Sequence, residues 1–243
     1  FVLHQAALGS VPVSIIDPVF AHENNLSGFL NMLVAAKDEG VARFIYASSS
    51  AVYGDRAEVP QKEEWLGECL SPYALTKLVD EMYAGVFAKV YGYKSIGLRY
   101  FNIFGPRQDP NGAYAAVVPQ WFSDLIHGRR AFINGDGETT RDFCHVDNCV
   151  QANIIAALGP EDALGLAYNV GNGGTTSLNK LFIYIREVLQ ETFPQVAKAK
   201  PSYREFRSGD VSHSMADIGK AQRLLGYEPL VSVREGLKSA GSW

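Results

Sequence analysis

Short apolar runs alternate with amphipathic stretches along the chain, and the two patterns predict different elements. Helical spacing of apolar residues predicts helices over residues 29–39 and 71–91, and Asp147 is expected to cap a further helix that runs through Ile155. Short apolar runs bounded by turn residues each predict a buried strand, and these are residues 1–3, 43–47, 95–101 and 168–171. Strand, helix, strand is the unit of a parallel sheet, so we expect an α/β fold.

The pattern after residue 107 is less regular. Residues 108–114 are polar and rich in Gly and Pro, which is typical of a loop. Pro119 is expected to open a short helix that reaches Ile126, and Ser177 to cap a helix from 178 to about 191. A small helix is expected to end at Gly226.

The helix over 71–91 carries candidate chemistry in its first turns. Ser71 can accept a backbone N–H as the N-cap, and Pro72 suits the first helical position because its missing donor would be unpaired there. Tyr73 and Lys77 then lie one turn apart on the same face. A nearby ammonium favours the phenolate over the phenol, whose reference pKa is about 10, so the pair can serve as a proton acceptor. The same spacing also fits a packed tyrosine beside a solvated lysine.

Small and polar residues follow two of the predicted strands. Ala6 and Ala7 follow the first strand, where small side chains let a flat ligand approach the backbone. Ser48, Ser49 and Ser50 follow the strand over 43–47. Because ligands of open α/β sheets bind outside the carboxyl ends of the strands, these hydroxyls can hold a polar reacting group. A tight connection and an ordinary serine-rich turn are the alternatives.

The helix over 71–91 has a wider apolar stripe than one sheet face requires. Its members recur at helical spacing and are Leu78, Val79, Met82, Tyr83, Val86, Phe87 and Val90. We therefore expect part of this stripe to form a homodimer through a helix pair.

Composition excludes several classes of protein. The 243 residues carry 22 Lys and Arg against 26 Asp and Glu, a net charge of -4 with no basic block, so a nucleic-acid partner is not expected. The apolar runs are too short to cross a bilayer, which favours a cytoplasmic protein without membrane contact. The 3 cysteines and 5 histidines have no metal-binding spacing, so no metal is expected.

Several motifs, taken in order, resemble the extended short-chain dehydrogenase/reductase family and specifically its sugar-nucleotide 4-epimerases. They are H-Q-A-A at 4–7, S-S-S-A-V-Y-G at 48–54, S-P-Y-A-L-T-K at 71–77, L-R-Y-F-N-I-F-G-P-R at 98–107, G-D-G-E-T-T-R-D-F-C-H-V-D at 135–147 and R-S-G-D-V-S-H-S-M-A-D at 207–217. The stretch R-Q-D-P-N-G-A-Y-A-A-V-V-P-Q-W at 107–121 is most similar to the bacterial UDP-N-acetylglucosamine 4-epimerases of surface-polysaccharide synthesis.

The resemblance implies that the protein interconverts UDP-N-acetylglucosamine and UDP-N-acetylgalactosamine by transient oxidation at C4, with tightly held NAD. Tyr73 is then the base for the 4-hydroxyl proton, Lys77 lowers its pKa and holds the nicotinamide ribose, and Ser50 binds the reacting oxygen with Ser49 nearby. The implied cofactor-binding residues are Ala6, Ala7, Ser48, Tyr73, Lys77 and Tyr100.

The resemblance also implies a substrate site. Ser214 matches the position that gates the sugar pocket, where a small side chain leaves room for an N-acetyl group. The UDP moiety is expected at Asn102, Arg141, Arg207 and Asp210, and the hexose end at Gly9, Ser10 and Gln108. Arginines suit a diphosphate because the guanidinium fork binds oxygens in pairs.

One family feature is missing from this sequence. The G-x-x-G-x-x-G turn that holds the NAD pyrophosphate does not occur, and neither does the acidic residue after the second strand. We therefore expect a Rossmann-like parallel sheet that lacks its first strands, cut from a longer chain, inactive alone, and open at the edge of the Phe1 strand. The expected division is 1–110 for the NAD-binding part and 111–243 for a smaller C-terminal substrate-binding lobe, with 142–171 returning to the Rossmann core.

Related activities are the alternatives. Dehydratases and decarboxylases of the family carry an acidic residue after the serine run, where this sequence has Ala51 and Val52. A UDP-glucuronate 4-epimerase differs in pocket details alone and stays open. An inactive sugar-nucleotide-binding fragment and a scaffold for nucleic acid are the alternatives from another class.

Overall fold

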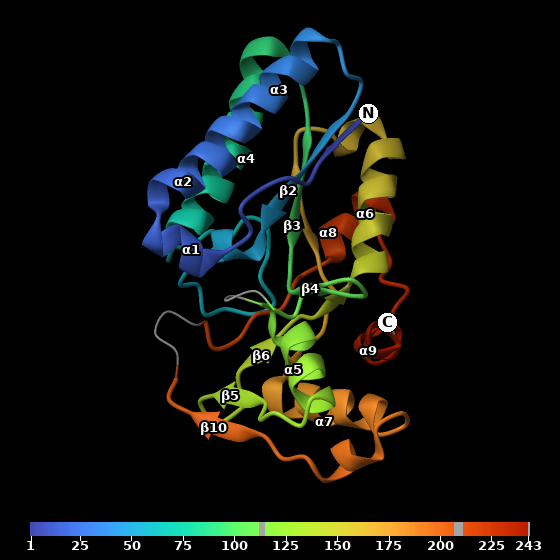
Figure 1. Cartoon of the computed structure of the whole chain (residues 1–243). Helices are drawn as coiled ribbons and strands as arrows, with labels where there is room; N and C mark the ends of the chain where they lie inside the picture. The colour runs from blue at the N-terminus through green and yellow to red at the C-terminus, as the bar shows by residue number, and fades with distance from the viewer. Residues whose placement is uncertain (112–114, 207–210, 243) are drawn as a thin grey trace.

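The computed structural model describes residues 1–111, 115–206 and 211–242. Its central sheet has four parallel strands in the order β1-β2-β3-β8, which confirms the α/β fold (Figure 1). The strands are β1 (Val2–His4), β2 (Phe44–Ser49), β3 (Ile96–Tyr100) and β8 (Ala167–Val170). β1 is the edge strand of this sheet, which confirms the expected open edge at the Phe1 strand. The expected burial of its side chains is wrong, because Leu3 is 47% exposed.

Helices cover both faces of the sheet (Figure 1). The alternation of side chains along β2 divides the core, because Phe44 and Tyr46 pack with α3 (Gly28–Asp38) and α4 (Pro72–Tyr91). Ile45 points the other way and packs with α6 (Val146–Leu158) and α8 (Gly219–Leu225). The sheet is thus buried on both faces, as parallel sheets require.

The helix α4 begins and ends where the sequence predicts. The side chain of Ser71 accepts a hydrogen bond from the backbone N–H of Ala74, Pro72 is the first helical residue, and Gly92 follows the helix with a left-handed φ of 68°. These local signals place Tyr73 and Lys77 in the first two turns.

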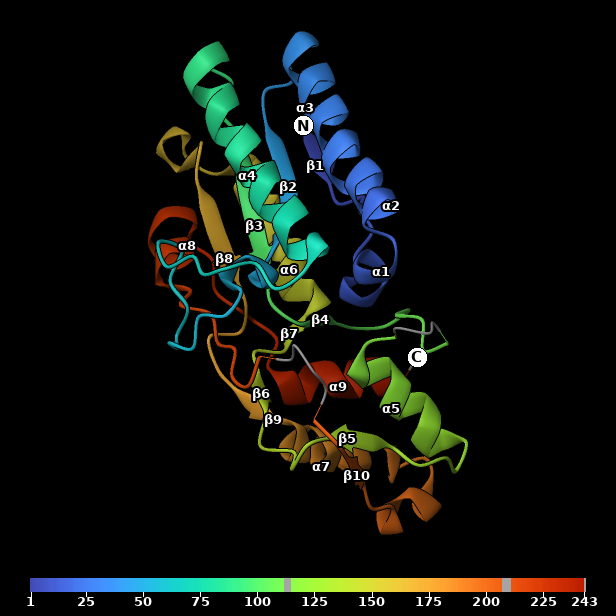
Figure 2. The same cartoon turned by 90° about the vertical axis from the view of Figure 1, so that its left-hand side faces the viewer.

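A second lobe packs around its own apolar core below the sheet in Figure 2, formed in part by Trp121, Phe182 and Leu237. Its helices are α5 (Val117–Ile126), α7 (Leu178–Leu189) and α9 (Val233–Gly241). Its short strands pair as β5 (Phe132–Asn134) with β10 (Ser202–Arg204), β6 (Thr140–Arg141) with β9 (Thr176–Ser177), and β4 (Ile103–Phe104) with β7 (Cys144–His145). The division at residue 110 stays a prediction.

Two expected helix starts are wrong. α5 begins at Val117, so Pro119 is its third residue. His145, not Asp147, caps α6, because the ring Nδ1 of His145 accepts a hydrogen bond from the backbone N–H of Asp147.

Some helices were not expected from the sequence. They are α1 (Val11–Ile16), α2 (Pro18–His22), the π-helical turn Glu23–Ser27 that joins α2 to α3, the 3-10 turns Ser50–Tyr53, Glu161–Ala163 and Pro194–Lys198, and α9. The capping box of Ser232 and Glu235 at the start of α9 was a readable signal. Among the helices of the described ranges, none has the length and apolarity needed to span a membrane.

Candidate active site

A cavity of about 720 Å³ opens at the carboxyl ends of the parallel strands, and we refer to it as the central cavity. Many of the predicted site residues line it together: Ala7, Gly9, Ser48, Ser49, Ser50, Tyr73, Lys77, Tyr100, Asn102, Arg141 and Ser214. They come from the strand ends, the start of α4, the second lobe and the segment between β10 and α8, which carries Ser214. The fold thus gathers residues that are far apart in sequence. The alternative of a packed tyrosine and a solvated lysine does not hold, because Tyr73 and Lys77 both face this cavity.

Tyr73 is held at both its backbone and its hydroxyl. Its backbone N–H donates to the buried Oγ of Ser14 at 3.0 Å, and its side chain is hydrogen-bonded to Ser49. Burial raises the pKa of Tyr73, the bond with Ser49 lowers it, and the charge of Asp80 raises it. In this arrangement the lowering of the pKa expected from Lys77 does not outweigh the effect of burial.

Lys77 is turned toward the interior of the cavity wall. Its ammonium donates to the carbonyl oxygen of Ala47 at 3.0 Å and to Oδ2 of Asp80 at 3.2 Å. Both side chains are almost fully buried. Burial raises the pKa of Asp80 to about 7, while the Lys77 ammonium lowers it. The second oxygen of this carboxyl group, Oδ1, is buried with no hydrogen-bond partner among the described residues.

The three serines have different partners. The Oγ of Ser49 accepts from the backbone N–H of Ala51 and starts the 3-10 turn Ser50–Tyr53. The hydroxyl of Ser48 donates to Glu81 on α4, which directs it away from a ligand. No hydrogen bond within the described residues engages Oγ of Ser50, so this hydroxyl is available in the cavity.

Asn102 and Arg141 line both the central cavity and a second cavity of about 780 Å³ in the lobe. The guanidinium of Arg141 donates to the carbonyl oxygen of Thr140 at 2.9 Å, which holds it at the border of the two cavities. The aromatic residues that line the second cavity are Phe104, Trp121, Phe132, Phe143 and Phe206. Together the two cavities form an elongated site with a cation near its middle.

The chain matches the family model "NAD dependent epimerase/dehydratase family" over residues 1–171. It is 34% identical to the UDP-glucose 4-epimerase of Mycolicibacterium smegmatis, over 97% of this chain and 73% of the relative. It is 33% identical to the UDP-glucuronate 4-epimerase of Thermodesulfobacterium geofontis, over 100% of this chain and 71% of the relative. The solved UDP-N-acetylglucosamine 4-epimerase of Methanobrevibacter ruminantium superposes with a TM-score of 0.92 at 37% identity, covering 99% of this chain and 75% of that one.

The chain belongs to the NAD-dependent epimerase/dehydratase family. NAD dependence fits the residues of the central cavity. Ala7 is small and lies beyond the end of β1, and Lys77 lines the same cavity. Tyr100 donates from its hydroxyl to Oε1 of Gln5 at 2.8 Å and accepts from Asn153, which fixes its ring in the wall. Gln5, Ala7, Tyr73, Lys77 and Tyr100 line this cavity and are the candidates for contacts with NAD.

Some predicted residues are not brought to the central cavity. Ala6 does not line it, and the side chain of Ser10 instead accepts from Val13 as the N-cap of α1. Gln108 lines a separate groove of about 240 Å³ with Phe122. It follows Arg107, whose left-handed φ of 70° turns the chain. Arg207 and Asp210 lie outside the described residues.

In the described ranges no three His, Cys, Asp or Glu side chains gather as a metal site requires.

Asp80, Gln5 and Gln61 line or adjoin the site, and the sequence reading missed them. Asp80 had a signal, because an acidic residue three positions after Lys77 lies on the same side of the helix. Gln5 had a signal as well, because it stands in the H-Q-A-A motif at 4–7. Gln61 had no signal, since its side-chain partner Ser214 is distant in sequence.

Proposed function

We propose that the protein interconverts UDP-sugars that differ in configuration at C4, and that UDP-N-acetylglucosamine and UDP-N-acetylgalactosamine are its substrates. The observation that carries the proposal is the position of Tyr73, hydrogen-bonded to Ser49 and facing the same cavity as Lys77 and Arg141. The family match and the 4-epimerases among its relatives support the reaction class.

The residues of the central cavity have distinct roles in this reaction. Tyr73 removes the proton of the sugar 4-hydroxyl, while Ser49 and the available hydroxyl of Ser50 hold the reacting oxygen. Tyr73 accepts this proton as the phenolate and becomes the phenol. The Lys77 ammonium favours the phenolate before the transfer, and a shift of its contact from Asp80 would strengthen this effect. The chemistry that NAD supplies when bound is reversible hydride transfer. Proton abstraction by a positioned side chain contributes about 10²–10⁴-fold to the rate.

The elongated site fits a sugar nucleotide. Arg141 lies where the two cavities meet and can bind diphosphate oxygens in pairs. The aromatic wall of the second cavity suits a stacked base, and the central cavity then receives the hexose beside Tyr73. Ser214 adds a small side chain to the central cavity and leaves space for an N-acetyl group.

A UDP-glucuronate 4-epimerase is the second candidate, and the relative from Thermodesulfobacterium geofontis favours it. The test is to incubate the protein with UDP-N-acetylglucosamine and with UDP-glucuronate, each with NAD in large excess so that weak retention of the cofactor does not limit turnover, and to separate the C4 epimers of each. We expect turnover of the acetylated sugar nucleotide. Turnover of the uronate alone would replace the substrate assignment, and turnover of neither would refute the epimerase proposal.

We also propose that the enzyme is a homodimer through a helix pair. On α4, Met82, Val86 and Val90 are 60%, 50% and 64% exposed and form one apolar stripe. Such a stripe is costly in water and is typical of an interface. Sedimentation equilibrium at micromolar concentration is expected to give the mass of two copies, and the mass of one copy would exclude the dimer.

The isolated 243 residues are proposed to retain NAD poorly, because their sequence contains no G-x-x-G-x-x-G turn for the pyrophosphate. Titration of NAD into the isolated chain measures this directly, and micromolar or tighter binding would contradict it.

A further inference from the structure

Gln61 has a fixed backbone at the wall of the central cavity. It is 3% exposed. Its backbone N–H donates to the carbonyl oxygen of Met215 at 2.7 Å, and its own carbonyl oxygen accepts from Asp217 N at 3.0 Å and from Nδ2 of Asn169 at 2.8 Å. These three bonds do not involve the Gln61 side chain. A substitution that keeps the backbone therefore leaves them in place.

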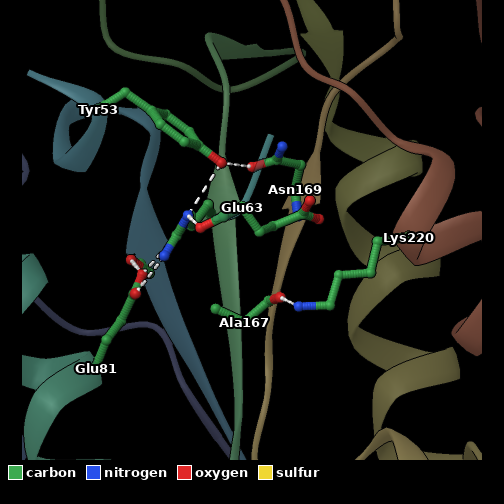
Figure 3. A network of polar contacts seen from close by, with 8 residues as sticks. Tyr53, Glu63, Glu81, Ala167, Asn169 and Lys220 are labelled. Carbon is green, nitrogen blue, oxygen red and sulfur yellow. Dashed lines mark hydrogen bonds and ion pairs between the residues drawn. The ribbon is translucent and has the colours of Figure 1, made fainter. Parts of the chain in front are cut away.

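Asn169, which donates to the carbonyl oxygen of Gln61, also belongs to a larger polar network on the sheet, and Figure 3 shows that network from Tyr53 to Glu81. The Oδ1 of Asn169 accepts from the hydroxyl of Tyr53, and this hydroxyl accepts in turn from Nη1 of Arg99 at 3.1 Å. Arg99 is itself paired with Glu81 on α4. Gln61 is thereby anchored through side chains to the same helix that carries Tyr73 and Lys77. Its position relative to the catalytic residues is fixed by rigid elements rather than by a free loop.

Only one of the two polar atoms in the Gln61 side chain is hydrogen-bonded within the described residues. Its Oε1 accepts a hydrogen bond from Oγ of Ser214 at 3.2 Å. Its Nε2 makes no hydrogen bond to any other described residue. This nitrogen is also not fully buried, because it does not belong to the buried polar atoms of the described residues that have no partner. Since Gln61 lines the central cavity, this amide nitrogen has its remaining access there.

The bond with Ser214 determines what the wall offers to a ligand. The proton of Ser214 is committed to Gln61, so its oxygen presents lone pairs to the cavity. The Nε2 of Gln61 presents N–H donors beside it. One donor and one acceptor, both neutral, are the complement of an acetamido group, whose carbonyl accepts and whose N–H donates.

A carboxylate fits this wall less well. A carboxylate has only hydrogen-bond acceptors, so one of its oxygens would face the lone pairs of Ser214 with no proton between them. The charged side chains among the described residues that line the central cavity are Lys77 and Arg141, and the Lys77 ammonium is engaged by Ala47 and Asp80. A plain hydroxyl at the same sugar position would leave the Gln61 donor without its carbonyl partner, which a site built for that contact disfavours.

We infer that Gln61, together with Ser214, recognises the acetamido group of the sugar and is a specificity-determining residue of this enzyme. The inference rests on the proposed 4-epimerase function. It assigns the choice between acetylated and plain hexose to a residue 153 positions from Ser214 in sequence.

The test compares two Gln61 variants of the protein, both measured with NAD in large excess. Gln61→Met keeps the length of the side chain but removes both polar atoms, and Gln61→Glu keeps an acceptor for Ser214 but removes the amide donor. For each, kcat/KM is measured with UDP-N-acetylglucosamine and with UDP-glucose. We expect both variants to lose about tenfold on the acetylated substrate, the worth of one hydrogen bond, and less than about threefold on UDP-glucose. Gln222→Met on the exposed face of α8 is the matched control and is expected to change neither value.

A second readout separates recognition from folding. The same substitutions in a Tyr73→Phe background, which binds without turnover, are expected to weaken the Kd of UDP-N-acetylglucosamine and leave that of UDP-glucose unchanged. Combining Gln61→Met with Ser214→Ala is expected to cost little more than either change alone, because the two side chains act as a pair. An equal loss on both substrates, or no loss on the acetylated one, would overturn the inference. If the wild-type protein epimerises neither sugar nucleotide, the proposed function fails instead.

Discussion

The buried ion pair of Arg99 and Glu81 gives a sharp test of what holds α4 to the sheet. Arg99 on β3 donates Nε and Nη2 to the two carboxylate oxygens of Glu81 at 2.9 and 2.7 Å. The side chains are 4% and 11% exposed. Glu81 also accepts from the hydroxyl of Ser48, at the end of β2. The perturbation is Glu81→Gln, which keeps the size of the side chain and removes its charge.

The chain offers a matched control for this change. Glu161 pairs with Arg43 at 2.8 Å, but its side chain is 83% exposed. Removing one partner of a buried pair leaves the other charge uncompensated and costs about 3–5 kcal/mol, and Glu81→Gln is expected near the lower end because the amide oxygen can still accept. An exposed pair contributes less than about 1 kcal/mol. Glu161→Gln is therefore expected to be close to wild type.

Urea unfolding at pH 7, followed by circular dichroism, measures both variants. We expect the free energy of unfolding to fall by about 3 kcal/mol for Glu81→Gln and by less than about 1 kcal/mol for Glu161→Gln, with the m-value unchanged. If the two variants differ by less than about 0.5 kcal/mol, burial does not govern this interaction and the reasoning is refuted.

Three further predictions follow from the site and its surroundings. Tyr73→Phe is expected to lower kcat by about 10²–10⁴-fold and to leave UDP-sugar binding by calorimetry unchanged; full activity would show that another group takes the proton. Burial raises the pKa of Asp80 to about 7, so the folded protein binds this proton more tightly than the unfolded chain; the resulting stabilisation is complete below the ordinary carboxyl pKa and is lost as pH rises toward 7. The free energy of unfolding of wild type relative to Asp80→Asn should therefore fall between pH 4 and 7, and parallel pH profiles would contradict this. Asp142 accepts from the backbone N–H groups of Asn172, Gly173 and Ala216; Asp142→Asn turns acceptors into donors there and is expected to lower the free energy of unfolding by about 2–3 kcal/mol, against no change in the melting temperature if these bonds are unimportant.

Local signals predicted the elements that carry the chemistry. The Ser71 and Pro72 start and the Gly92 end of α4 depend on backbone groups within one turn, so they could be read directly. The start of α6 could not be read from the sequence in this way. Asp147 and His145 are both able to cap the helix, and their packing decides between them. The open edge at β1 was expected from the missing glycine-rich turn, but the exposure of the Leu3 side chain could not be read from the apolar run, since the burial of a strand depends on its neighbours in the sheet.

The sequence by itself determined that Tyr73 and Lys77 share one face of a helix, and that serines follow the neighbouring strand. Helical spacing and strand order are short-range properties, so the residues themselves contain that information. Tertiary structure alone decided that the Lys77 ammonium meets Asp80 and Ala47, and that Gln61 meets Ser214. These contacts depend on how buried polar groups find partners across the whole fold, and no local period along the chain specifies that choice.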